Sequence, residues 1–338
     1  MQTSEQGQVT PERLMQLGSA YAPPLVIGAA INNKVFDTLA TGTKTVAQIS
    51  KETRASERGL RIVMNALVGL ELLRKNGDQY SLTPESEAFL VSNKPGSLAG
   101  FFPMNMKRLI PIWLNLDEIV RTGKPGEARN EEHPGTEFFS ELVENIIPAS
   151  YGCAQVLADH LQIADRKSAT RVLDIAAGSG IWGIAFAQKS PDVRVAAVDW
   201  EGMIPTTKRI TQKFGVAKQF DFIEGDIGEV DFGMGYDVAT LGHILHSEGA
   251  ERSRQLLKKT GRSLKSGGTI AIAEWIVNDE RTEPLPSLMF AVQMLVNTEH
   301  GDTFSLNEIK KWLEEAGFKD VRTFDAPGPS PLVLATKT

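Results

Sequence analysis

Two aspartates and a run of glycines form the first pattern in the sequence that could do chemistry. The segment RVLDIAAGSGIWGIAFAQ carries Asp174 ahead of Gly178 and Gly180, and VRVAAVDW carries Asp199, 19 residues after Gly180. Glycine lets the backbone of a turn approach a ligand closely, because no Cβ is in the way. An acid at the tip of the next strand is placed to accept hydrogen bonds from two ribose hydroxyls. The pattern therefore indicates a cofactor that contains a nucleoside.

The type of cofactor depends on what precedes the glycines. Gly178, Gly180 and Gly183 also fit the dinucleotide pattern G-x-G-x-x-G, so a nicotinamide cofactor is an alternative. A pyrophosphate gains nothing from the fixed negative charge of Asp174, whereas S-adenosylmethionine carries an ammonium and a sulfonium and no phosphate. Asp174 therefore favours S-adenosylmethionine. A third interpretation is that the glycines only form a tight strand-to-helix turn.

A histidine and a glutamate supply acid–base chemistry further along the chain. His246 is expected to close the strand-like segment YDVATLGHIL, and Glu274 lies near the end of GGTIAIAEWIV. A neutral imidazole, with a pKa of about 6.5, suits proton removal from a phenol of pKa about 10 during methyl transfer. If the two strands are neighbours, both residues meet on one rim, and the carboxylate fixes the tautomer of the imidazole. The alternatives are a solvated loop histidine and a glutamate paired with a lysine.

His243 lies three residues before His246. On an extended strand it points to the face opposite that of His246. The alternative is that it approaches the methionine end of the cofactor.

The elements that must position these residues divide the chain into three parts. Residues 167–338 alternate strands and helices, which predicts a Rossmann-like α/β domain with a mostly parallel sheet of seven strands, the last two at 319–325 and 331–336. Residues 1–98 read as helices and one hairpin turning at Asn76-Gly77, the order of a winged helix. Residues 99–166 read as a helical linker and pocket region, including one long helix over about 137–162.

Composition narrows the function classes. The chain has 338 residues, a net charge of −6 and one cysteine, Cys153, so an internal disulfide and a cysteine metal site are excluded. An acidic surface argues against nucleic acid or anionic lipid as a partner. The N-terminal segment MQTSEQGQVTPERL lacks a signal-peptide core, and we expect no stretch to reach the length of a membrane helix. We therefore expect a cytoplasmic protein without a bound metal.

The order of these parts resembles the plant- and bacterial-type small-molecule O-methyltransferases, which include caffeate, acetylserotonin and carotenoid O-methyltransferases of the class I S-adenosylmethionine-dependent type. The resemblance covers nearly the whole chain. VFDTLATGTKTVAQISKETRASERGLRIVMNALVGLELLRKNGDQYSLTPESEAFLV is similar to the winged-helix dimerisation domain, DIAAGSGIWGIAFAQKSPDVRVAAVDW to the cofactor motif and YDVATLGHILHSEGAERSRQLL to the catalytic segment. The resemblance implies a homodimer that methylates a small apolar or aromatic molecule and releases S-adenosylhomocysteine. It assigns catalysis to His246 and Glu274.

Further site residues are expected around this motif. The resemblance points to Asp226 for the adenine amine, with Ile227 and Trp200 on either side of the ring. Ala176, Gly242 and His243 complete the cofactor-binding set. The acceptor pocket is expected to be mostly apolar, although an apolar stripe can also be plain core; its residues are Phe139, Leu142, Val143, Ile146, Tyr151, Trp275, Phe290, Met294 and His300.

Three departures from the family pattern leave a second chemistry open. Ala176 stands where the family has glycine, Ser247 and Glu248 stand where it often has aspartate and tryptophan, and Asp302 is the nearest match to a second carboxylate expected near residues 301–305. Some relatives bind the cofactor but carry out hydroxylation, decarboxylation or pericyclic reactions. Such non-methylating chemistry is the alternative.

A DNA-binding regulator is the rival from another function class, because winged helices can read DNA. The segment SERGLRIVMNALVGLELL has Arg58 and Arg61 near its start, but the rest is almost wholly apolar. A helix that reads base edges needs polar groups along its exposed face. The segment is therefore expected to be buried on both sides, as in a dimer interface.

Overall fold

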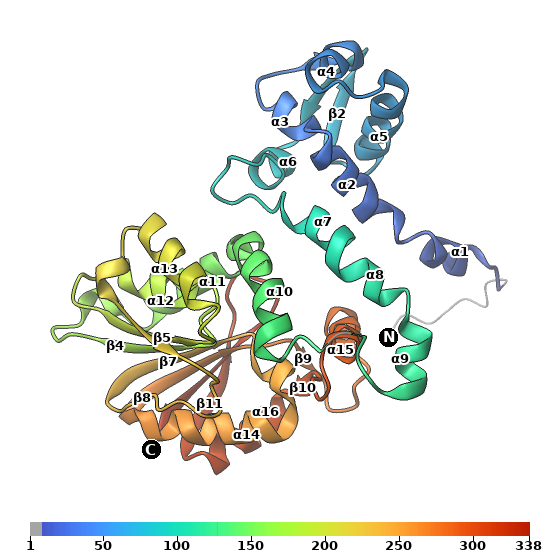
Figure 1. Cartoon of the computed structure of the whole chain (residues 1–338). Helices are drawn as coiled ribbons and strands as arrows, with labels where there is room; N and C mark the ends of the chain where they lie inside the picture. Colours follow the sequence, from blue (N-terminus) through green and yellow to red (C-terminus); the bar gives the residue numbers. More distant parts are fainter. Residues whose placement is uncertain (1–8, 127) are drawn as a thin grey trace. The chain divides into compact units, whose positions relative to one another are not determined.

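The computed structural model describes residues 9–126 and 128–338, so the first eight residues of the polar N-terminal segment lie outside the described part. The chain separates into two compact units, Met1–Leu109 and Ile110–Thr338 (Figure 1). The boundary falls inside the stretch 99–166 that the sequence assigns to a linker.

The first unit is mainly helical, as predicted. Its capping residues follow from sequence: Thr45 forms a capping box with Gln48, Ser56 caps the next helix, and Gly77 turns the hairpin at a φ of +61°. Three short strands pair in the order β1-β3-β2. The elements are α1 (Glu12–Gly18), α2 (Ala22–Asn32), α3 (Val35–Leu39), β1 (Lys44–Thr45), α4 (Val46–Thr53), α5 (Glu57–Gly69), β2 (Leu73–Asn76), β3 (Gln79–Leu82), α6 (Pro84–Phe89), α7 (Phe101–Met104) and the π-helix η1 (Asn105–Leu109).

Two helical segments of this unit differ from what their sequences suggest. The apolar segment 25–39 is long enough for one helix but forms two, because Lys34 adopts a φ of +56° between α2 and α3. Within the single chain, α5 buries only one face, with Leu60, Met64 and Leu67. On its other side Ile62 is 47% exposed beside the exposed Arg61.

One stretch of the described residues, Glu12–Asn32, is long and apolar enough by composition to cross a membrane, so the expectation that none exists is wrong. It comprises α1 and α2, and a Pro-Pro pair begins α2. None of the α1 residues is buried, and Leu14, Met15 and Leu17 are each more than 60% exposed. Apolar side chains gathered in this way indicate a surface that is covered by something else.

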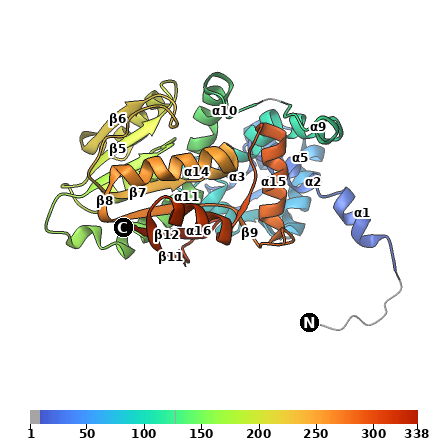
Figure 2. The same ribbon diagram turned by 90° about the horizontal axis from the view of Figure 1, so that it is seen from below.

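The second unit is built on the predicted seven-stranded sheet, with strand order β11-β12-β8-β7-β4-β5-β6. The central strands pair in parallel, and β12 runs antiparallel to both β8 and β11. One face is covered by α11, α12 and α13, and the other by α14 and α16 (Figures 1 and 2). The strands are β4 (Arg171–Ile175), β5 (Arg194–Asp199), β6 (Phe220–Glu224), β7 (Tyr236–Gly242), β8 (Leu264–Ala273), β11 (Phe318–Phe324) and β12 (Leu332–Lys337).

The helices of this unit show where local sequence was misleading. The expected helix over 137–162 is two helices that meet at Ile146, and Pro148 stands in the first turn of the second. The remaining elements are α8 (Ile110–Trp113), α9 (Leu116–Thr122), α10 (Glu132–Asn145), α11 (Ile147–His160), η2 (Ile163–Asp165), α12 (Ile181–Ala187), α13 (Ile204–Lys213), η3 (Ala217–Gln219), α14 (Leu245–Ser263), β9 (Ile276–Val277), α15 (Leu285–Asn297), β10 (Phe304–Ser305) and α16 (Leu306–Glu315).

The close approach of α12 to the sheet depends on Gly183. An ideal Cβ at this position would lie 2.6 Å from Cγ1 of Val195 and 3.1 Å from Oδ2 of Asp174. Gly183→Ala should therefore lower the free energy of unfolding by about 1–3 kcal/mol through overpacking. Urea denaturation would measure this loss as a lower midpoint concentration with an unchanged m-value.

Gly152→Ala is the matched control, because Gly152 lies inside α11 with nothing within 4 Å of its ideal Cβ. It should be neutral or raise stability by up to about 1 kcal/mol, since alanine is the better helix former. Equal losses in the two variants would contradict the close-approach explanation.

Candidate active site

The glycine turn connects β4 to α12 with three residues in the left-handed backbone region. Ala176, Gly178 and Gly180 have φ values of +52°, +54° and +72°. Alanine in this region costs on the order of 1 kcal/mol, so the surrounding contacts must hold it there. The turn is fixed from outside by the Thr207 hydroxyl, which donates to the Gly178 carbonyl at 2.7 Å.

The two aspartates flank this turn and are both buried. Asp174 accepts hydrogen bonds from the Thr240 hydroxyl at 2.7 Å and the Gly183 N–H at 3.0 Å, and burial raises its pKa to about 7. Asp199 accepts from the N–H groups of Gly178 at 2.6 Å and Trp200 at 2.8 Å. Burial raises the pKa of Asp199 to about 6.

The residues expected near an adenine lie beyond the ends of β5 and β6. The ring of Trp200 is 6.3 Å from that of Phe139 on α10, and an ideal Cβ at Gly135 would overlap it. Ile227 is buried. Asp226 accepts from the Gly228 N–H and pairs with Arg252 at 3.2 Å, and no sequence pattern indicated this ion pair.

Arg252 also binds a second acid on its own helix. Its Nε lies 2.6 Å from Oε2 of the buried Glu248, one of the residues that depart from the family pattern. Burial raises the pKa of Glu248, although Arg252 opposes the shift. The three charges thus link the loop after β6 to the start of α14.

His246 and Glu274 form a direct pair. Nδ1 of His246 lies 2.9 Å from Oε2 and 3.1 Å from Oε1 of the carboxylate. The expectation that His246 closes a strand is wrong, because β7 ends at Gly242 and His246 lies in the first turn of α14. A carboxylate on Nδ1 leaves Nε2 as the nitrogen with a lone pair.

Glu274 is held by more than the imidazole. It also accepts from the backbone N–H groups of His246 at 3.2 Å and Trp275 at 3.1 Å. Burial raises the pKa of Glu274, but the hydrogen bonds and the charge of His246 outweigh burial and hold the pKa below its usual value. The carboxyl is therefore ionised at neutral pH, ready to stabilise a charged imidazole.

An aromatic wall borders the imidazole. The Phe290 ring lies edge-on to His246 with 4.8 Å between centroids, and Trp275 stacks on Phe290 at 4.7 Å. Phe290 comes from α15, so this helix supplies one side of the space around His246.

His243 has a different environment from the one expected of a strand residue. Its φ of +64° ends β7, and its N–H donates to the Ala273 carbonyl at 2.9 Å. Nε2 lies 2.8 Å from the Ser330 hydroxyl. Burial lowers the pKa of His243 to about 4, so the ring is neutral.

The other residues predicted to line the acceptor pocket have different environments. Val143 lies against the glycine turn, because an ideal Cβ at Gly178 would be 3.0 Å from its Cγ1. Met294 on α15 is buried, while Leu142 and Ile146 are half-buried on α10 and at its end.

Tyr151 and His300, both predicted to line the acceptor pocket, have other surroundings in the structure. The Tyr151 hydroxyl donates to Gln188 at 2.6 Å, and its ring packs on Phe214. The His300 side chain is 73% exposed. Asp302 donates its N–H to the His246 carbonyl, but its carboxylate faces Arg281 at 3.5 Å.

Sequence reasoning missed Asn297 near the end of α15. Its side chain is buried, and its Oδ1 has no hydrogen-bond partner among the described residues. An unsatisfied buried acceptor is unusual and marks a point where a ligand can bind. Among the residues that the structure describes, no group of three histidine, cysteine, aspartate or glutamate side chains could hold a metal ion.

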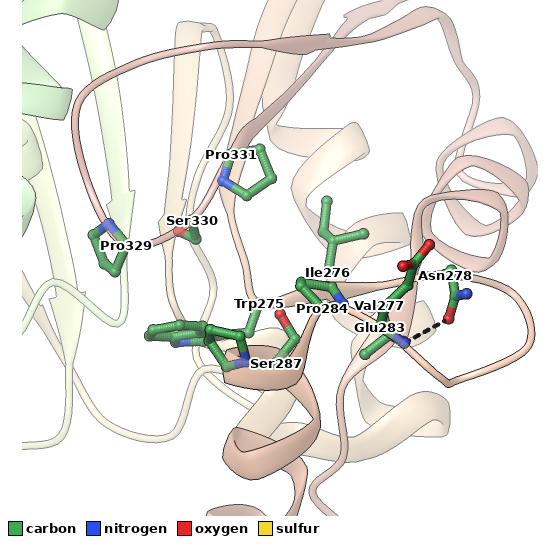
Figure 3. A pocket seen from close by; sticks show the side chains of 11 residues that line it. Trp275, Ile276, Val277, Asn278, Glu283, Pro284, Ser287, Pro329, Ser330 and Pro331 are labelled. Atoms are coloured by element: carbon green, nitrogen blue, oxygen red, sulfur yellow. Dashed lines mark hydrogen bonds between the residues drawn. The ribbon is translucent and has the colours of Figure 1, made fainter. Parts of the chain in front are cut away.

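A cavity of about 470 Å³ lies beside Trp275 (Figure 3). Trp275 and Ser287 form one side and the loop with Pro329, Ser330 and Pro331 the other. Of the predicted site residues only Trp275 lines it, so the cavity adjoins the aromatic wall and not the glycine turn.

Comparison with known proteins identifies the fold and both units. The O-methyltransferase domain family matches residues 149–319, and the O-methyltransferase dimerisation domain family matches residues 15–92. The chain is 26% identical over 332 residues to the tetracenomycin polyketide synthesis 8-O-methyl transferase TcmO of Streptomyces glaucescens, covering 97% of each protein. It is also 26% identical to acetylserotonin O-methyltransferase of Bos taurus, covering 96% of this chain and 97% of the relative.

Solved structures agree with these matches. A putative O-methyltransferase from Nostoc punctiforme aligns with a TM-score of 0.88 and 26% identity, over 98% of this chain and all of that one. Human N-acetylserotonin methyltransferase in complex with S-adenosylmethionine aligns with a TM-score of 0.84 and 23% identity, over 99% of both chains, which supports the fold. The catalytic family model alone covers half of the chain, so this protein belongs to the S-adenosylmethionine-dependent O-methyltransferase family and carries that family's dimerisation domain.

Proposed function

We propose that the protein moves the methyl group of S-adenosylmethionine to a hydroxyl of a small, flat and largely apolar molecule, with His246 as the general base. The observation that carries this proposal is the contact between Nδ1 of His246 and the carboxylate of Glu274. Two relatives are named for related acceptors, a tetracenomycin polyketide and 3-hydroxy-5-methyl-1-naphthoate.

The residues at the carboxyl edge of the sheet fit the cofactor. At the glycine turn, Gly178 and Gly180 let the backbone approach the ligand, and a Cβ at Gly178 would fill space close to Val143. Asp199 would accept from the ribose hydroxyls and Asp174 would balance the ammonium. Asp226 would accept from the adenine amine, with Trp200 and Ile227 against the ring. When bound, S-adenosylmethionine supplies a methyl group already activated by the sulfonium.

His246 and Glu274 would then perform the proton transfer. With Nδ1–H donated to Glu274, the Nε2 lone pair would take the proton from the acceptor hydroxyl as the methyl group passes from sulfur to the hydroxyl oxygen. Glu274 stabilises the imidazolium that forms, as a carboxylate does in other histidine-based sites. Holding the two reactants at reacting distance supplies the rest of the acceleration.

The acceptor would lie against apolar side chains. Phe290 and Trp275 offer a flat aromatic surface beside His246, and Met294 extends it along α15. Flat hydrophobic molecules suit such a surface. The departures at Ala176 and Ser247 leave the His246–Glu274 pair intact, so non-methylating chemistry is not favoured.

The domain roles complete the proposal. Residues 1–98 would form the dimerisation domain, 99–166 would contribute to the acceptor pocket, and 167–338 would bind the cofactor. The dimerisation family match supports a homodimer, and the exposed apolar side chains of α1 would be covered by the second copy. A cytoplasmic location fits the single buried Cys153, whose pKa burial raises to about 11.

His246→Gln should lower kcat by roughly 10²–10⁴-fold, because the acceptor hydroxyl loses its base. Glu274→Gln should cause a smaller loss and shift the pH profile. Methyl transfer to a panel of hydroxylated naphthoates, followed by mass spectrometry, measures both effects.

Calorimetric titration should show unchanged S-adenosylhomocysteine affinity in His246→Gln, since His246 is proposed to act on the acceptor. His160→Gln is the matched control, because His160 ends α11 and packs on Phe324. Full activity of His246→Gln would refute the assignment of the base.

Binding of S-adenosylhomocysteine should weaken as pH falls from 8 to 6. Burial raises the pKa of Asp174 to about 7, so below this pH a proton competes with the ligand ammonium for the carboxylate. Calorimetric titration at pH 8, 7 and 6 measures the slope, to which Asp199, with a pKa of about 6, adds at the acid end.

Asp174→Asn separates the two acids: its affinity should be lower at pH 8 and change less down to pH 7. Because burial raises the pKa of Asp174 in the folded protein, the ionised carboxylate lowers the free energy of unfolding of the ligand-free protein. The stability that the protonated carboxyl contributes is therefore present at low pH and lost as pH rises through about 7. The free Asp174→Asn protein should therefore unfold at a higher temperature than wild type at pH 8. A steep pH slope retained in the variant would exclude Asp174 as its origin.

Light scattering should give a mass of about twice the 36.9 kDa of one chain. Changing Leu14 and Leu17 on α1 to aspartate should shift the protein toward monomer, since both are exposed apolar residues that a second copy would cover. Met234→Asp, at an equally exposed methionine of the other unit, is the control and should remain dimeric. A dimer that survives both α1 changes would place the interface elsewhere.

A further inference from the structure

The indole of Trp182 occupies the position of a missing side chain at the end of β7. An ideal Cβ at Gly242 would overlap Nε1 of Trp182, and the neighbouring ring carbons lie almost as close. Gly242 does not have a positive φ, so its backbone conformation is open to any residue. The absence of a side chain at 242 therefore serves to admit the indole.

The Trp182 nitrogen is a donor without an acceptor. None of the described residues accepts a hydrogen bond from Nε1, although the side chain is only 5% exposed. This nitrogen is not completely buried, because it is not among the fully buried and unpartnered polar atoms of the described residues. An indole N–H only donates, which means that its partner must be an acceptor such as a carboxylate.

The sheet order shows which part of the cofactor lies there. Under the proposed binding mode, Asp199 and Asp226 follow β5 and β6, on one side of β4, and hold the adenosine. Gly242 ends β7, on the other side of β4, close to His246 where the methyl group must react. The amino-acid end of the cofactor is therefore on the Trp182 side.

The amino-acid carboxylate of the cofactor would need a hydrogen-bond donor or a cation at this end of the site. The segments 174–183 and 240–246 contain no lysine or arginine, and His243 is neutral and already paired with Ser330. Asp174 suits the ammonium but repels the carboxylate attached to the same carbon. Trp182 precedes Gly183, whose backbone N–H binds Asp174, and its indole N–H is a neutral donor suited to that carboxylate.

We propose that the Trp182 indole N–H, which the absence of a side chain at Gly242 admits to the end of β7, binds the carboxylate of the amino-acid end of S-adenosylmethionine. This inference rests on the cofactor assignment above and adds a residue that positions the cofactor and recognises its amino-acid end.

The test compares two ligands on the full-length protein. S-Adenosylhomocysteine has the amino-acid end, whereas 5′-methylthioadenosine has the same adenosine and sulfur without it. Trp182→Phe should weaken S-adenosylhomocysteine binding about tenfold, the size expected for one hydrogen bond to a charged group, and leave 5′-methylthioadenosine binding unchanged. Gly242→Ala should cause the same selective loss, because its Cβ displaces the indole.

Trp312→Phe is the matched control for removing a buried indole, since Trp312 lies on α16 and packs on Phe304. It should alter neither affinity. Equal losses for both ligands in Trp182→Phe, or no loss for either, would overturn the inference. If wild type itself failed to bind S-adenosylhomocysteine, the cofactor assignment would fall, and this result appears before any variant is made.

A measurement on the wild-type protein removes dependence on the folding of variants. The indole N–H signal of Trp182, assigned by its absence in Trp182→Phe, should move downfield in the ¹⁵N spectrum on addition of S-adenosylhomocysteine and not of 5′-methylthioadenosine. The same shift with both ligands, or none with either, would contradict the proposed contact.

Discussion

The buried charge of Glu274 is the constraint on which the active site depends. An unpaired carboxylate inside a protein is very costly, so the surrounding chain must supply hydrogen-bond donors. Glu274 obtains them from the His246 ring and from the N–H groups of His246 and Trp275. These bonds tie the end of β8 to the first turn of α14. The orientation of the imidazole is thus a consequence of satisfying the carboxylate, and Nε2 is the nitrogen proposed to act on the acceptor.

At the carboxyl edge of the sheet, where the cofactor is proposed to bind, small residues make room for larger neighbours. Gly242 admits Trp182, Gly135 admits Trp200, and Gly178 lies against Val143. At Ala176 the turn accepts a left-handed residue with a Cβ. The shape of this edge is therefore set by pairs of small and large side chains that are distant in sequence.

Periodicity and glycine placement predicted the sheet, its last two strands and the glycine turn. The positions of His246 and Glu274 after two strands that could be neighbours predicted that they meet. They did not predict that His246 lies on a helix, because YDVATLGHIL reads as one apolar strand. The strand ends where His243 adopts a positive φ, and contacts from Ala273 and Ser330 support that residue. The Arg252–Asp226 pair and the position of Trp182 also depend on tertiary neighbours. Local sequence contains no signal for such contacts.

The charged residues after the histidine show how this chain differs from the family pattern without losing the site. Glu248 stands where the family often has tryptophan, and its burial would be unfavourable without Arg252. Arg252 in turn binds Asp226, so one guanidinium joins the first turn of α14 to the loop proposed to contact adenine. An aromatic residue at 248 would leave Arg252 with one carboxylate and Asp226 less firmly held. The acid at position 248, where the family often has an aromatic residue, is therefore accommodated by the two ion pairs that Arg252 forms with Glu248 and Asp226.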